Sequence, residues 1–149
     1  MTQKKKLSEV MNPKKLIRMP STVSAADAAR KMLERQVGAI VVMEGDTLHG
    51  IVTERDINYR VVAVGRDPAT TTLFDIMTKN PKCMAPSTPV VDALDHMQKQ
   101  GHQHMPLMED GKVVGIVSAR DIFLEVKRAL EQDLEESDRF IVSGGETTH

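Results

Sequence analysis

Two short segments of the chain place a hydroxyl, a guanidinium and a carboxylate at the same spacing. They are Thr53, Arg55 and Asp56 in the first segment and Ser118, Arg120 and Asp121 in the second. A hydroxyl residue followed three positions later by an acidic residue is typical of a helix N-terminus, where the pair forms a capping box worth about 1 kcal/mol. The same groups also suit a ligand. Free N–H groups at a helix N-terminus attract phosphate, and a carboxylate can accept hydrogen bonds from ribose hydroxyls.

The two arginines bear on the choice between these interpretations. A cation in the first turn of a helix is opposed by the helix dipole by roughly 0.3 to 1 kcal/mol, so capping alone gives no reason to find Arg55 and Arg120 there. A bound phosphate, or a carboxylate across an interface, gives such a reason. Common descent of the two segments also explains why the arginine occurs twice, and both interpretations stay open on the residues alone.

The two segments belong to a longer internal repeat. Residues 49–57 return as residues 114–122, an offset of 65. At the same offset Asp27 matches Asp92 and Met32 matches Met97, while residues 10–12 resemble residues 76–78 at an offset of 66. We therefore predict two copies of one unit. The predicted organisation is a basic tail at 1–7, the first repeat at 8–66, a linker at 67–73, the second repeat at 74–134 and a flexible C-terminal tail at 135–149.

Each copy predicts the same order of elements, β-α-β-β-α. Ser24 in the first copy and Thr88 followed by Pro89 in the second are expected to begin the first helix. Neither copy is large enough to bury its sheet alone, so the predicted fold class is an α+β sandwich of the α/β type, with the repeats packed about a pseudo-twofold axis. The expected extended segments are 16–18 and 82–84, the expected hairpins 39–53 and 105–118, and the expected second helices 53–64 and 118–134.

The composition excludes several classes of function. Twenty basic and 21 acidic residues give a net charge of −1, and the chain has four aromatic residues and no Trp. We therefore do not expect nucleic acid as a partner, because neither a general positive field nor a base-stacking platform is present. A single cysteine, Cys83, suits a reducing compartment. No long apolar stretch and no secretory signal occur, so we expect no membrane span and a cytoplasmic location.

The two ends of the chain carry opposite charge. Residues 1–18 contain six basic residues and one acidic residue, whereas residues 125–139 contain six acidic and three basic residues. Both runs are explained by solvated surface, and a complementary contact between subunits is the alternative. The basic end also leaves nucleic-acid binding as a third and weaker hypothesis for function.

The duplicated Gly-Ile-Val-Thr/Ser-x-x-Asp-Ile element after a β-α-β unit resembles a tandem pair of CBS domains, also called a Bateman module. The resemblance covers about residues 7–134, and residues 59–72 are also similar to those of stand-alone pair proteins without an enzyme domain. It implies two stacked three-stranded sheets with helices outside, in a pair that often forms a homodimer. It also implies clefts between the copies that bind AMP, ADP, ATP or S-adenosylmethionine, with no cofactor required.

The resemblance assigns residues to each cleft, taking the hydroxyl and Asp from one copy and the start of a strand from the other. Copy two has the familiar Pro106 on that strand where copy one has Val41, so the clefts are expected to differ in affinity. One cleft would use Thr53, Arg55 and Asp56 with His102, His104, Met105 and Pro106. The other would use Ser118, Arg120 and Asp121 with Val37, Gly38, Ala39 and Ile40.

These expectations favour a regulatory module over an enzyme. No set of nucleophile, base and orienting residue occurs, so no catalytic residue is predicted. His96, His102 and His104 lack an acidic or Cys partner at a useful spacing, so a cleft or surface role is preferred to a metal site. The predicted function is a sensor of adenosine ligands that signals to an unknown protein partner. The alternative is a dimerisation or adaptor protein that needs no ligand.

Overall fold

The computed structural model describes the backbone of residues 5–148 and the side chains of residues 5–139. Both repeats contain a strand or bridge, a helix, a hairpin and a second helix. The first half consists of η2 (Leu7–Glu9), η3 (Pro13–Lys15), β1 (Arg18–Met19), α1 (Ala25–Arg35), β2 (Ala39–Glu44), β3 (Thr47–Thr53), α2 (Glu54–Ile57) and the π-helical turn η4 (Asn58–Val62). The second consists of α3 (Leu73–Ile76), β4 (Thr78–Lys79), α4 (Val90–Gln100), β5 (His104–Glu109), β6 (Lys112–Ser118) and α5 (Ala119–Thr148).

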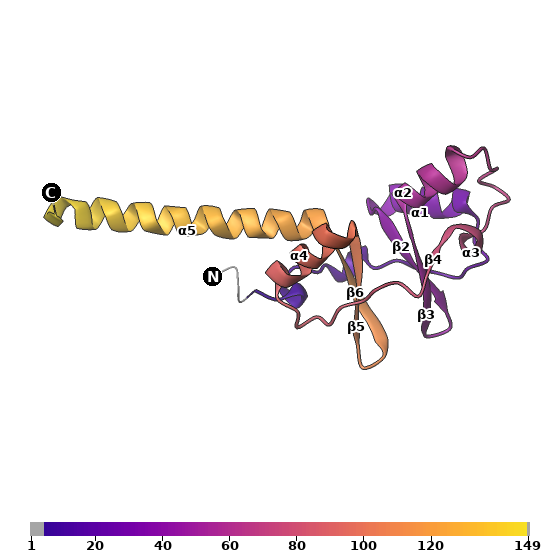
Figure 1. Cartoon of the computed structure of the whole chain (residues 1–149), viewed down its shortest axis with the longest axis horizontal. Coiled ribbons are helices and arrows are strands. Elements are labelled where there is room, and N and C mark those ends of the chain that lie inside the picture. Colours follow the sequence, from indigo (N-terminus) through magenta and orange to yellow (C-terminus); the bar gives the residue numbers. More distant parts are fainter. Residues whose placement is uncertain (1–4, 149) are drawn as a thin grey trace.

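The two hairpins have the same register, which confirms the repeat in three dimensions. Val41 lies opposite Ile51 in the first hairpin, and Pro106 lies opposite Ile116 in the second. Figure 1 shows the two repeats side by side, with both hairpins pointing toward the same edge of the molecule. The mixed α+β class predicted from the sequence is confirmed.

The sheets differ from the three strands each that the resemblance implied. Within the described residues, one sheet has four strands in the order β1-β2-β3-β4 and the other has only β5 and β6. The strand expected at 82–84 is reduced to a single parallel bridge between Met84 and Leu107. Pairing stops there because the chain turns toward the N-terminal segment, where the Pro86 carbonyl accepts a hydrogen bond from Ser8 N at 2.9 Å.

Strand alternation divides the apolar side chains between three clusters. Ile40 and Val42 point into the core of the first repeat, beneath α1. Met105 and Leu107 point into the core of the second, beneath α4. The opposite faces of the strands meet between the repeats, in a cluster that contains Ala39, Val41, Ile51 and Ile116. The pair of repeats therefore has a shared apolar layer that neither repeat could form alone.

The repeats exchange the segments that precede them. Leu7 from the N-terminal segment is fully buried in the core of the second repeat, and its counterpart Leu73 is fully buried in the core of the first. Leu7 N donates to Thr88 O and Leu73 N donates to Val23 O, both at 2.9 Å. The prediction that residues 1–7 form a tail is therefore wrong for residues 5–7, because Leu7 is part of a core and Lys5 and Lys6 contact the second repeat. Residues 1–4 lie outside the described part of the chain.

The N-termini of α1 and α4 are satisfied in different ways. Ser24 Oγ accepts a hydrogen bond from Asp27 N at 3.1 Å, as predicted. In the second repeat the predicted cap Thr88 is not used, and no side chain caps α4. Instead Val90 N donates to Lys5 O at 2.9 Å, so the backbone of the exchanged segment satisfies the helix.

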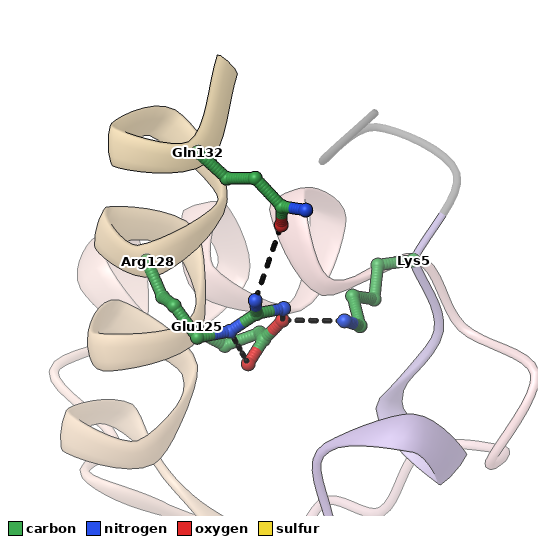
Figure 2. A network of polar contacts seen from close by, with 4 residues as sticks. All are labelled: Lys5, Glu125, Arg128 and Gln132. Atoms are coloured by element: carbon green, nitrogen blue, oxygen red, sulfur yellow. Dashed lines mark hydrogen bonds and ion pairs between the residues drawn. The ribbon is translucent and has the colours of Figure 1, made fainter. Parts of the chain in front are cut away.

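Residues 60 and 125 occupy equivalent places in the two repeats and hold the exchanged segments in different ways. Arg60 Nη1 donates to the Ile76 carbonyl at 2.9 Å. Glu125 forms an ion pair with Lys5 at 2.5 Å and accepts two hydrogen bonds from Arg128 (Figure 2). The basic N-terminal segment and the acidic C-terminal helix therefore meet within one chain at this point.

Helix α5 continues through the stretch that was predicted to be a flexible tail. The sequence analysis ended the helix near residue 134, whereas α5 runs to Thr148 and extends far beyond both repeats in Figure 1. Residues 119–139 are rich in Ala, Leu, Glu, Lys and Arg, which favour helix. The ion pair between Lys127 and Glu131, one turn apart, adds to this. No helix of the described chain is long and apolar enough to cross a bilayer.

Candidate functional site

Two cavities lie between the repeats, and each is built from both copies. The Asp121 cavity, of about 600 Å³, combines Val37, Gly38 and Ala39 with Ser118, Arg120 and Asp121. The Asp56 cavity, of about 420 Å³, combines Thr53, Arg55 and Asp56 with His102, His104 and Pro106. The structure thus brings together twelve of the fourteen residues that the sequence analysis grouped, in the two predicted sets.

The other two residues, Ile40 and Met105, do not line either cavity. Both side chains are fully buried in the cores of their own repeats. The prediction took a continuous run of residues at the start of each strand. Successive side chains of a strand point to opposite faces, so alternate members of such a run point away from the cavity.

Asp56 is closely held by its own helix. Its Oδ2 accepts hydrogen bonds from Thr53 N at 2.8 Å and from Thr53 Oγ1 at 3.1 Å, while Asp56 N donates to Thr53 Oγ1 at 3.2 Å. Arg60 Nε lies 3.7 Å from the other carboxylate oxygen, Oδ1. The side chain is 13% exposed. The complete capping box therefore occupies one oxygen, and an ion pair faces the other.

Asp121 is held more loosely. Asp121 N donates to Ser118 Oγ at 3.0 Å, but no reciprocal bond from Ser118 N to the carboxylate occurs among the hydrogen bonds of the described residues. The carboxylate instead accepts a hydrogen bond from Lys15 Nζ at 3.2 Å. Its exposed fraction is 26%, twice that of Asp56. The carboxylate in the larger cavity is thus the more available one.

His104 lies where the two cavities meet, and it lines both. Its Nδ1 is buried without a hydrogen-bond partner among the described residues. Burial lowers the pKa of the imidazole, partly offset by the nearby Glu54 and Asp121 carboxylates, so the ring is neutral near pH 7. The backbone of Gly38 comes close to this ring, since a Cβ at that position would stand 3.1 Å from His104 Nε2.

Several cavity residues were not predicted. Glu54 and Asn58 line both cavities with His104, and Lys15 and Lys82 line one each. Glu54 and Asn58 are one helical turn apart directly after Thr53, so their shared face could have been inferred from the spacing. Lys15 gave no such signal, because it is 106 residues from Asp121 along the chain.

The remaining candidate groups do not form sites of their own. Within the described residues, no three His, Cys, Asp or Glu side chains are placed to hold a metal ion. The rings of His96 and His102 are 5.9 Å apart between centroids. Cys83 Sγ donates to Pro81 O, and burial raises the pKa of its thiol, which disfavours the reactive thiolate.

Known proteins match the chain over most of its length. A protein of Acidianus ambivalens is 37% identical over 78% of this chain and 70% of its own. A mitochondrial CBS domain-containing protein of Arabidopsis thaliana is 32% identical over 79% of this chain and 60% of its own, so this chain spans less than two thirds of that relative. The crystal structure of a conserved protein from Pyrococcus horikoshii superposes with a TM-score of 0.78 and 32% identity, over 86% of this chain and 96% of that one.

Two further findings complete the comparison. A CBS domain pair solved in complex with 5′-methylthioadenosine and S-adenosyl-L-methionine has the same fold, with a TM-score of 0.74 and 24% identity over 84% of this chain and 98% of that one. The family description "CBS domain" matches residues 7–63 and again residues 73–128, which together make up most of the sequence. The chain therefore belongs to the CBS-domain family, as a tandem pair.

Proposed function

We propose that this CBS pair is a regulatory module that binds an adenosine-containing ligand, of the AMP, ADP, ATP or S-adenosylmethionine class, between its repeats. The observation that carries the proposal is the Asp121 cavity. It brings together an available carboxylate, two cations and an apolar wall to which both repeats contribute. The related pair solved with S-adenosyl-L-methionine adds support for this class of ligand.

The chemistry of the Asp121 cavity matches the parts of a nucleotide. The Asp121 carboxylate suits the vicinal hydroxyls of a ribose, because one carboxylate can accept both hydrogen bonds. Lys15 and Arg120, which line the same cavity, suit a phosphate or carboxylate group. Apolar side chains from both repeats suit an adenine ring, which would pack against aliphatic groups because aromatic residues are scarce. The apolar side chains are those of Ala29, Met32, Val37 and Ile116.

A ligand in this position contacts both repeats, so its binding favours the arrangement of the repeats that fits it best. The shift is limited by the difference in affinity between the two arrangements. We propose that the changed surface is what a protein partner recognises, that the chain acts in the cytoplasm as a homodimer, and that it has no catalytic activity of its own. A hexameric CBS-containing neighbour supports the tendency to self-associate.

A ligand-independent adaptor is the second candidate. The observation that favours it is a group of exposed apolar side chains on and just after η4, a surface suited to protein contact. Tyr59 and Val62 are each 66% exposed and Val64 is 63% exposed. An adaptor of this kind would hold its partner equally well with empty cavities.

The test is a thermal-shift and calorimetry panel with AMP, ADP, ATP, NADH and S-adenosylmethionine. A true ligand at one hundred times its Kd stabilises the protein by about 2.7 kcal/mol. Asp121→Ala should remove the effect in the larger cavity. Asp75→Ala is the matched control, because Asp75 completes a capping box with Thr72 away from both cavities. If no member of the panel shifts the midpoint, the sensor proposal is wrong and the adaptor stands.

A further inference from the structure

Helix α5 carries an apolar stripe that the repeats do not cover. Phe123, Leu130 and Leu134 are 57%, 53% and 63% exposed. Their spacing of seven and four residues places them on one face of the helix. We call these three residues the α5 stripe. Single exposed apolar residues are ordinary on a protein surface, whereas a row of them along one helix face marks a surface that contacts another molecule.

The stripe points away from the chain's own body. The face of α5 that packs on the second repeat carries Ile122, which is fully buried, and Val126, which packs against the same core. Glu125 ties that face to the N-terminal segment through Lys5, as Figure 2 shows. The adjacent face, with the stripe, therefore stays free while the root of the helix is fixed in direction.

The described outer part of α5, residues 131–139, is exposed along its whole length. The helix projects well past the globular body in Figure 1. Its 30 residues span about 45 Å. Helices gain most of their stability from packing of an amphipathic face rather than from propensity. A projecting helix with an uncovered apolar face is therefore typical of an element that packs against a partner.

The charges beside the stripe indicate what that partner is. The inner stretch of the helix, residues 119–130, has three basic and two acidic residues, and the two acidic side chains also pair with Lys5 and Lys15. Two of the basic side chains already have partners on the helix, since Arg128 pairs with Glu125 and Lys127 with Glu131. The outer stretch, residues 131–139, has five acidic residues and one Arg, so it keeps a clear excess of negative charge. An antiparallel copy of the same helix places the inner stretch against the acidic outer stretch. A parallel copy would place the two acidic stretches together, which is unfavourable.

We propose that the α5 stripe binds the α5 stripe of a second copy of this chain, with the two helices antiparallel. Phe123 of each copy then lies near Leu134 of the other, and the Leu130 side chains meet near the centre. The interface is isologous and closes after two copies, so it produces a dimer rather than a fibre. This inference rests on the homodimer part of the proposed function and does not depend on ligand binding.

The first test measures the mass of the intact protein by light scattering coupled to size-exclusion chromatography. The wild type should have twice the mass of one chain. The double variant Leu130→Glu/Leu134→Glu should have the mass of one chain, with unchanged helicity by circular dichroism. Val91→Glu, at an exposed apolar position on α4, is the matched control and should leave the dimer intact.

The outcomes separate the inference from the proposed function. A dimer that survives Leu130→Glu/Leu134→Glu overturns the α5 interface and leaves the homodimer proposal standing. A wild type that is monomeric overturns both, and the stripe would then serve a different protein. Ligand binding is measured separately and has no bearing on either result.

The second test fixes the orientation by disulfide trapping in a Cys83→Ser background, which removes the native thiol. In an antiparallel pair, a Cys at position 134 is separated from its twin by roughly 16 Å along the helix axis, beyond the reach of a disulfide. Phe123→Cys mixed with Leu134→Cys should give a cross-linked heterodimer under mild oxidation, whereas Leu134→Cys alone should not cross-link. Efficient cross-linking of Leu134→Cys alone would show a parallel pair and overturn the orientation.

Discussion

The Asp56 and Asp121 cavities contain the same hydroxyl–Asp motif at the same place in two copies of one fold, yet their carboxylates are engaged differently. Asp56 completes a capping box with Thr53 and also faces Arg60. Asp121 lacks the reciprocal bond of that box and reaches Lys15 from the distant N-terminal segment instead. The comparison shows that the capping box occupies a carboxylate oxygen that the proposed ligand would also need. A motif can therefore be intact in sequence and only partly available in the folded protein.

The difference between the two carboxylates predicts which cavity binds ligand more tightly. A ribose that binds the Asp56 carboxylate must break the capping box, which costs about 1 kcal/mol. A ribose that binds Asp121 displaces only an exposed lysine, which costs little. A difference of about 1 kcal/mol corresponds to roughly a fivefold difference in Kd, because about 1.4 kcal/mol corresponds to a factor of ten. We therefore expect the Asp121 cavity to fill first, at roughly a fivefold lower ligand concentration.

The largest predicted effect tests whether the two exchanged segments are equivalent. Leu7→Ala and Leu73→Ala each remove a fully buried side chain, and each should lower the free energy of unfolding by about 2–5 kcal/mol in urea denaturation. Leu33→Ala, at a position that is 74% exposed, is the control and should change little. A cost below 1 kcal/mol for Leu7→Ala alone would mean that the N-terminal segment is not an integral part of the second repeat.

The second prediction concerns the two carboxylates directly. Asp121→Ala should weaken the tighter site by about 10- to 100-fold, because a hydrogen bond to a charged group contributes roughly 1.5–3 kcal/mol. Asp56→Ala should leave that site unchanged and affect only the weaker one. Isothermal titration calorimetry of both variants with the best ligand of the panel makes the comparison. A larger loss in Asp56→Ala would reverse the order of the cavities.

A third prediction compares the glycines of the two hairpins. A Cβ on Gly50 would meet the Thr78 backbone carbonyl at 2.8 Å, whereas a Cβ on Gly115 would meet Met11 Sδ at 2.5 Å. A methionine side chain can move and a paired strand cannot, so Gly50→Ala should cost about 1–3 kcal/mol and Gly115→Ala distinctly less. Equal losses in thermal denaturation would mean that the methionine is held as firmly as the strand.

The smallest effect distinguishes how the two repeats hold their exchanged segments. Hydrogen bonds from Arg128, with Lys5 as the second partner, lower the pKa of Glu125 to about 2. Because this folded-state pKa is below the ordinary 4.5, the contribution to stability is present above pH 5 and is lost as the pH falls toward 2. Glu125→Gln should be less stable than wild type by about 1 kcal/mol or less at pH 7.

The pH dependence of stability tests whether the effect of Glu125→Gln comes from the charge of the carboxylate. The difference in the free energy of unfolding between Glu125→Gln and wild type should shrink as the pH falls from 5 to 2. Chemical denaturation at each pH measures this difference. Glu136→Gln removes the same charge from an exposed position of the same helix and should show no comparable trend. The corresponding contact in the first repeat, Arg60 to the Ile76 carbonyl, has an acceptor that does not titrate.

The repeat and its elements could be predicted because their signals are local. The offset of 65 aligned the two hairpins correctly, and the grouping of residues around each cavity followed from the family resemblance. The period of a strand could also have removed Ile40 and Met105 from the predicted sites, since the alternation was visible in the sequence. These parts depend on neighbours in the chain or on a pattern that occurs twice.

The parts that escaped prediction depend on contacts between distant residues. Lys15 meets Asp121 only because η3 packs beside β6. Lys5 replaces Thr88 as the partner of the α4 N-terminus only because the N-terminal segment crosses to the other repeat. The extension of α5 was missed for another reason. The helix was predicted to end where the charge density rises, and the polar end with Gly144 and Gly145 was interpreted as flexible, although Leu, Glu and Arg in this stretch favour helix.

The exchange of preceding segments means that neither repeat exists as one continuous stretch of chain. Residues 67–72 connect two halves that each contain a piece of the other's core, in the manner of a domain-swapped dimer joined into one polypeptide; Leu73, predicted as the end of the linker, already belongs to the first core. The smallest cooperative unit is consequently the pair, which should unfold in a single transition. Cutting the linker should leave two fragments that are unstructured apart and assemble with each other when mixed.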